Sequence, residues 1–278
     1  MRRSTTFAGT KRAVLGSLLL AELVLAGAVL VRVPHASPPS PPAAAPASLT
    51  TSTAAATTET LRDGRTVRLL NLAGPPEAPL LTRIAAEMND AADAVTLFWG
   101  GDWPRSIVIV ATGSDAEFAT LAGAGPDVAA TTTAERITFA PGAAEMSDAS
   151  LRIVVRHELF HYAARARTAA DAPTWLTEGV ADFVGRPATP RPPPDAADLA
   201  VLPTDADLGS VGPQRSLAYD RAWWFSRFVA DQYGVAALRG LYLRACAPGH
   251  PDAAAAVRET LGADLPAVVS RWRQWLTR

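Results

Sequence analysis

The five residues from His157 to His161 carry the strongest chemical signal in this sequence. They read His-Glu-Leu-Phe-His, and two histidines four positions apart on a helix share one face, so both imidazoles can bind one metal ion. Two imidazole nitrogens at about 2.0–2.1 Å supply half of a tetrahedral zinc site. Glu158 lies beside the pair, where its carboxylate can accept a proton from a zinc-bound water. The spacing therefore predicts a hydrolytic zinc centre.

The alternative is a surface helix with two unrelated histidines, since the pattern arises by chance in about one chain of this length in a hundred. The neighbouring residues argue against it. Ile153, Val154, Val155, Leu159 and Phe160 are all apolar, which indicates a buried helix. Buried histidine and glutamate side chains need polar partners, so we favour the metal site.

A catalytic zinc keeps three protein ligands and one open position. The segment from Trp175 to Gly179 reads Trp-Leu-Thr-Glu-Gly. With the His-Glu-Leu-Phe-His stretch, it resembles the gluzincin zinc peptidases, which include thermolysin, and more closely the bacterial peptidase MA-like families. The resemblance implies that zinc is the cofactor and that Glu178 is its third ligand. A metzincin would need glycine and histidine where this chain has Ala164 and Arg167, so that class is excluded.

The same resemblance implies roles for two further residues. Thermolysin-like enzymes carry an aspartate four positions after the ligand glutamate, which accepts a hydrogen bond from a zinc-binding histidine; here it is Asp182, toward His157. A tyrosine on the following helix often stabilises the oxyanion, which implies that role for Tyr219. The alternatives are a surface aspartate and a tyrosine that only packs. Residues 136–140 are expected to form an edge strand that binds peptide through its main chain.

The surrounding sequence must supply the elements that position these residues. Asp148 is expected to cap a helix that runs through His161 to about residue 167, and a second helix covers residues 174–184. A loop follows at residues 186–213. The predicted class is α+β, a zincin-like domain with a small N-terminal mixed sheet and a helical C-terminal part. The other expected elements are strands at 66–72, 106–111 and 136–140, a short helix capped by Ser114 and Glu117, and helices at 79–99, 217–233, 235–245, 252–261 and 265–276.

The N-terminal residues predict export. Basic residues precede an apolar run between residues 13 and 33, which is about long enough to span a bilayer with the following residues outside. We expect residues 1–33 to be a membrane anchor or a cleaved signal segment, residues 34–60 a disordered Pro/Ala/Thr-rich linker, and residues 61–278 the metallopeptidase domain. The localisation that follows is the cell membrane, with the domain outside, or secretion if the segment is cleaved.

Composition limits the function classes. The formal net charge of -1 at pH 7 gives no electrostatic reason to expect a nucleic-acid partner. Cys246 is the one cysteine, so no internal disulfide forms. The tryptophans of the C-terminal half are expected in the core.

The sequence therefore predicts an exported zinc metallopeptidase that hydrolyses a peptide or protein substrate, with Glu158 as general base. The alternative is a metal-bearing binding or regulatory domain, or a hydrolase of a non-peptide amide. An intramembrane protease is excluded because the helix of His157 also carries Arg152 and Arg156.

Overall fold

The computed structural model describes residues 55–72, 74, 79–125, 127–191 and 199–277. The predicted membrane segment and most of the predicted linker lie outside the described residues, so both stay predictions. Across the described ranges, no helix has both the length and the apolar character that crossing a bilayer requires.

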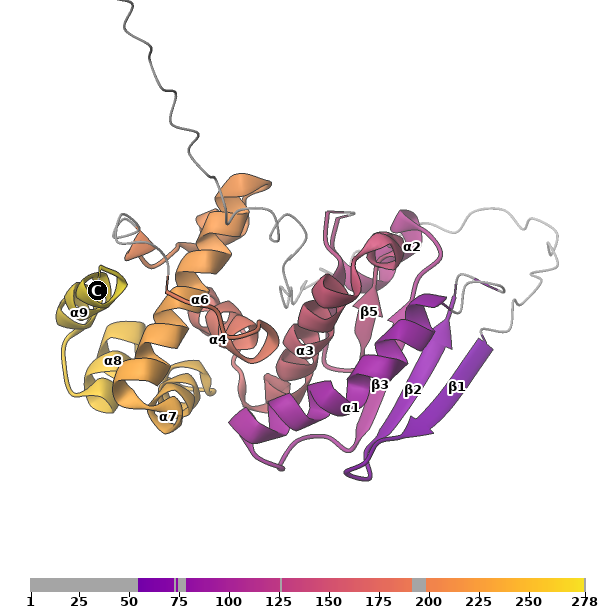
Figure 1. The fold of residues 1–278 in the computed structure, drawn as a ribbon, viewed down its shortest axis with the longest axis horizontal. Helices are drawn as coiled ribbons and strands as arrows, with labels where there is room; N and C mark the ends of the chain where they lie inside the picture. The colour runs from indigo at the N-terminus through magenta and orange to yellow at the C-terminus, as the bar shows by residue number, and fades with distance from the viewer. Residues whose placement is uncertain (1–54, 73, 75–78, 126, 192–198, 278) are drawn as a thin grey trace, which may run out of the picture.

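A five-stranded mixed sheet forms the N-terminal part of the fold (Figure 1). Its strand order is β1-β2-β3-β5-β4. The three inner strands run parallel, and each edge strand pairs antiparallel with its neighbour. Burial alternates along β2, as expected for a sheet with one face on the core. The strands are β1 (Ala55–Thr60), β2 (Thr66–Asn71), β3 (Ser106–Ala111), β4 (Ala130–Thr132) and β5 (Ile137–Phe139).

Two strands correct the expectations from sequence. β1 occupies residues that we assigned to the linker; it pairs with β2 across a turn in which Gly64 takes a φ of +81°. The linker prediction is therefore wrong for residues 55–60. The expected edge strand, β5, is an inner strand, and the edge is β4. A three-residue strand is too short to show a period in the sequence.

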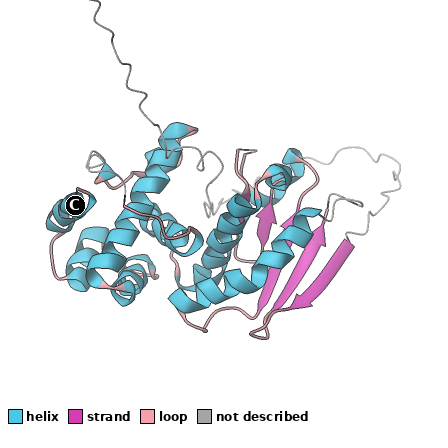
Figure 2. Ribbon diagram, viewed as in Figure 1, coloured by secondary structure: helices cyan, strands magenta, loops and turns pink. Residues whose placement is uncertain are grey.

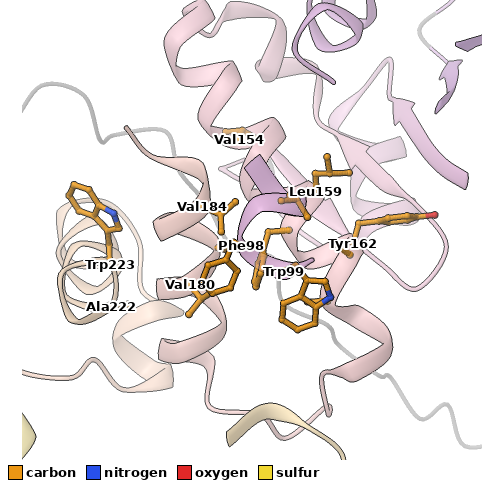
Figure 3. Close-up of a cluster of buried hydrophobic side chains, with 14 of the residues drawn as sticks. Phe98, Trp99, Val154, Leu159, Tyr162, Val180, Val184, Ala222 and Trp223 are labelled. Carbon is orange, nitrogen blue, oxygen red and sulfur yellow. The ribbon is translucent and has the colours of Figure 1, made fainter. Parts of the chain in front are cut away.

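Two helices cover one face of this sheet and connect it to the candidate site. α1 (Pro79–Trp99) and α3 (Asp148–Ala164) pack against each other across it. Figure 3 shows the junction with α4 (Thr174–Gly185), where Phe98 of α1, Leu159 of α3 and Val180 of α4 gather in one apolar cluster. The helices α3 and α4, which carry the candidate metal ligands, therefore belong to one continuous core.

Local caps set where the helices begin. Ser114 caps α2 (Asp115–Ala122) by accepting from the Glu117 N–H, as predicted, whereas the Glu117 carboxylate accepts from the Gly113 N–H and not from that of Ser114. α3 is capped by Ser147, whereas Asp148 is its first helical residue, and the helix continues beyond Ala164 as a short 3-10 turn, η2 (Arg165–Arg167). A second 3-10 turn, η1 (Pro141–Glu145), precedes α3.

Helices form the C-terminal half (Figure 2). The five tryptophans expected in the core, Trp175, Trp223, Trp224, Trp272 and Trp275, are all buried. The predicted loop contains one short helix, α5, whose capping box joins Thr204 and Asp207. The remaining helices are α5 (Asp205–Leu208), α6 (Pro213–Tyr233), α7 (Val235–Cys246), α8 (Ala253–Leu261) and α9 (Leu265–Leu276). The α+β class, with a small mixed sheet followed by helices, is confirmed.

Candidate metal centre

The two histidines of α3 face the same point in space. His157 is fully buried, and the side chain of His161 is 12% exposed. Their Nε2 atoms lie 3.1 Å apart. The spacing of four residues thus brings both imidazoles together, as the sequence predicts, because residues four apart lie on the same face of a helix.

Glu178 comes to the same point from α4, which packs between α3 and α6 (Figure 1). Its Oε2 lies 3.2 Å from His157 Nε2 and 3.6 Å from His161 Nε2. The neighbouring Gly179 explains how α4 reaches this position. A Cβ on Gly179 would lie 2.8 Å from Ser226 Oγ and closer still to the Ala222 carbonyl oxygen, so only glycine allows this approach to α6.

The three atoms fit a zinc ion. A circle through them has a radius of about 1.9 Å, close to a zinc–ligand bond of about 2.0–2.1 Å, so these three atoms could hold one zinc ion. Neither carboxylate oxygen of Glu178 has a hydrogen-bond partner among the described residues, although Glu178 is buried. A buried carboxylate without a partner is costly, and a cation held by His157, His161 and Glu178 removes that cost.

Asp182 fixes the orientation of His157. Its Oδ1 lies 3.0 Å from His157 Nδ1. In its neutral form the imidazole therefore carries its proton on Nδ1, and the lone pair of Nε2 faces His161 and Glu178. Burial alone would lower the pKa of His157, but its hydrogen bond with Asp182 and the nearby negative charges of Asp182 and Glu178 raise that pKa to about 10. Likewise, burial would raise the pKa of Glu178, while the two histidines lower it to about 2. The site therefore favours a positive charge, which a bound metal ion would supply.

Glu158 is held by a residue that the sequence did not reveal. The hydroxyl of Thr132, on edge strand β4, donates to Glu158 Oε2 at 2.6 Å. Burial raises the pKa of Glu158, although the two histidines and Thr132 oppose this. A carboxyl group with a raised pKa accepts and returns a proton more readily near neutral pH. Thr132 lies 26 residues before its partner, and no local spacing in the sequence links the two.

Tyr219 of α6 lies beside the candidate ligand His157. It is fully buried, and its ring centroid is 6.5 Å from that of His157. Within the described chain its hydroxyl has no aligned hydrogen-bond partner. Burial, followed by the charges of Glu178 and Asp182, raises its pKa, so the hydroxyl stays protonated and available as a donor. Its role toward an oxyanion stays a prediction.

Two more charged residues extend the site and were not predicted. Arg186, which ends α4, has its Nη2 2.6 Å from Asp182 Oδ2, an ion-pair distance without hydrogen-bond alignment. Its Nη1 donates to Asp220 Oδ1 at 2.8 Å. An arginine directly after a helix ordinarily signals only a solvated helix end, so the sequence held no sign of this pairing.

Comparisons with known proteins give fold likenesses of low similarity. No protein-family model matches the sequence, and no curated protein matches it. The chain is similar to a variant of the M1 zinc metallopeptidase of Deinococcus radiodurans, at 18% identity and a TM-score of 0.48, over 80% of this chain and 52% of that one. It is also similar to aminopeptidase A of Legionella pneumophila, at 14% identity and a TM-score of 0.47, over 79% of this chain and 28% of that one. The chain thus spans about half or less of these structures, and at this similarity the function must follow from the site itself.

Proposed function

We propose that this protein is a zinc metallopeptidase of the gluzincin type. The observation that carries the proposal is the triangle of His157 Nε2, His161 Nε2 and Glu178 Oε2, with sides of 3.1, 3.2 and 3.6 Å. Those distances suit three ligands of one tetrahedral zinc ion, and Glu158 stands next to them without being one of them. A purely structural zinc site needs no such base.

Each residue then has a separate task. Zinc, when bound, supplies a Lewis acid that polarises a carbonyl group and lowers the pKa of water. Glu158 accepts a proton from the attacking water and delivers it to the leaving nitrogen. Thr132 keeps the carboxylate of Glu158 in place, Asp182 keeps the His157 ring in place, and Tyr219 donates a hydrogen bond to the developing oxyanion.

Substrate and location complete the proposal. The substrate is a peptide or protein, by the resemblance of the two ligand segments to gluzincins. The domain acts outside the cytoplasmic membrane, to which residues 1–33 tether it unless they are cleaved. This part rests on the sequence, namely on basic residues followed by an apolar run.

One observation favours a second candidate, a metal-bearing domain without peptidase activity. Glu158, Glu178 and Tyr219 are each 1% exposed or less, and a substrate must reach the first and the last of them. A peptidase must therefore open this site during its cycle, whereas a regulatory metal site could stay closed.

Metal analysis and one substitution separate the candidates. The purified protein should hold about one zinc per chain, and His161→Ala should lose it. Glu158→Gln should keep the zinc and abolish cleavage of a mixture of fluorogenic peptides, because it removes a base and no ligand. Glu259→Gln, at an exposed ion pair with Arg244, is the matched control and should cleave normally. Zinc-loaded wild-type protein that cleaves no peptide would favour the regulatory domain.

A further inference from the structure

Arg186 is a buried arginine, which itself calls for an explanation. Its side chain is 4% exposed, and taking a guanidinium out of water is costly unless it is paired. Arg186 is paired twice, with Asp182 Oδ2 at 2.6 Å and Asp220 Oδ1 at 2.8 Å. Its guanidinium carbon also lies 4.8 Å from the centre of the Trp223 ring, a distance at which a cation is attracted to an aromatic face.

Of the two carboxylates that Arg186 joins, Asp182 contacts the candidate ligand His157, and Asp220 lies on the helix that carries Tyr219. The other oxygen of Asp182, Oδ1, accepts from His157 Nδ1. Asp220 directly follows Tyr219 on α6. A continuous chain of contacts therefore runs from the ligand His157 through Asp182 and Arg186 to the helix that carries the proposed oxyanion donor.

We propose that Arg186 is a positioning residue of the metal centre, an inference that rests on the proposed zinc site. Through the ion pair between its Nη2 and Oδ2 of Asp182, it holds that oxygen on the side away from His157, so that Oδ1 faces the imidazole. The planar guanidinium presents several N–H donors in a rigid fork and can bind two carboxylates at once, whereas the ammonium group of lysine is a point charge. An arginine at this position therefore supplies both the positive charge and the shape that pairing with Asp182 and Asp220 requires.

The competing explanation is that Arg186 only ties α4 to α6. In that case Arg186→Met would weaken folding, and any change in zinc affinity would be equally large in the wild-type and in the Asp182→Asn background. The two explanations differ in one measurable respect, the coupling between Arg186 and Asp182, which a double-mutant cycle isolates.

The test measures zinc affinity of the full chain by competition with a chromophoric chelator. Arg186→Met should weaken zinc binding by about 10–100-fold, as the loss of residues that support metal ligands commonly does. Arg186→Lys should fall between wild type and Arg186→Met. Arg227→Met is the matched control, because Arg227 lies 5.5 Å from the same Trp223 ring but hydrogen-bonds to Thr189 instead; its affinity should equal that of the wild type.

The cycle is completed in the Asp182→Asn background, where Arg186→Met should change zinc affinity by less than about threefold because its partner is already lost. An equal loss in both backgrounds, or no loss in either, overturns the inference. If circular dichroism shows that Arg186→Met does not fold, the change in zinc affinity caused by Arg186→Lys is compared between the two backgrounds, and the same outcomes decide. Wild-type protein that binds no zinc overturns the proposed function together with this inference, whereas zinc-binding wild type with unchanged Arg186 variants overturns this inference alone.

Discussion

Thr132 and Glu158 join edge strand β4 to helix α3, with 2.6 Å between the hydroxyl Oγ1 and the carboxylate Oε2. The hydroxyl also lies 3.0 Å from the main-chain oxygen of Glu158. Strand β4 thus holds the proposed base directly, so it would support the proposed chemistry through Thr132.

Thr132→Val should reduce kcat by about 10–100-fold, because a hydrogen bond to a charged group contributes about 1.5–3 kcal/mol. Valine keeps the shape of threonine, so zinc content should not change. Thr132→Ser keeps the hydroxyl and should retain most of the activity. Steady-state cleavage of a fluorogenic peptide and metal analysis check both variants; normal kcat in Thr132→Val would show that Glu158 needs no such support.

Tyr219→Phe should lower kcat by about 10²–10³ with little change in KM, as expected when one oxyanion donor is removed. The ring remains to pack, so folding and zinc content should equal those of the wild type. If Tyr219 only packs, turnover stays near normal. One kcat measurement on zinc-loaded protein separates these results.

Gly179→Ala should destabilise the domain by about 1–3 kcal/mol, since the added methyl group overpacks the contact between α4 and α6. Gly240→Ala is the control. Gly240 also lies within a helix, but its Cβ would meet only Thr260 Cγ2 at an ordinary 3.6 Å, so alanine there should add about 0.5–1 kcal/mol of stability. Urea unfolding gives both free energies. Equal effects at the two positions would mean that α4 and α6 are packed less closely than described.

Cys246 should be almost inert to thiol reagents in the folded protein. The side chain is fully buried, and burial raises the pKa of its thiol to about 12 from a usual value of 9.0. Very little reactive thiolate therefore exists at pH 8. Because folding raises this pKa, the thiol contributes its stability in full below pH 9 and loses it as the pH rises through about 12. Alkylation with iodoacetamide, followed by mass spectrometry, should be slow in buffer and rapid in denaturant; rapid reaction in buffer would show that α7 is not packed as described.

The sequence by itself determined the elements whose signals are local. The apolar spacing of α1 and the apolar run of β3 predicted the residues at which both begin and end. His157, Glu158 and His161 lie within one helical turn of one another, so their relation follows from helix geometry alone. Glu178 and Asp182 came from a segment that resembles a known family, and the structure brings both to the histidines.

Only the tertiary structure decided the contacts between elements. β1 and β4 owe their existence to pairing with neighbouring strands, and such pairing leaves no period in a short segment. The pairs Thr132–Glu158 and Arg186–Asp220 join residues 26 and 34 positions apart. The first pair depends on how β4 packs on α3, and the second on how α4 packs on α6, where the missing side chain at Gly179 allows a close approach. A sequence read locally states which groups could do chemistry, whereas the packing of helices and strands decides which of them meet.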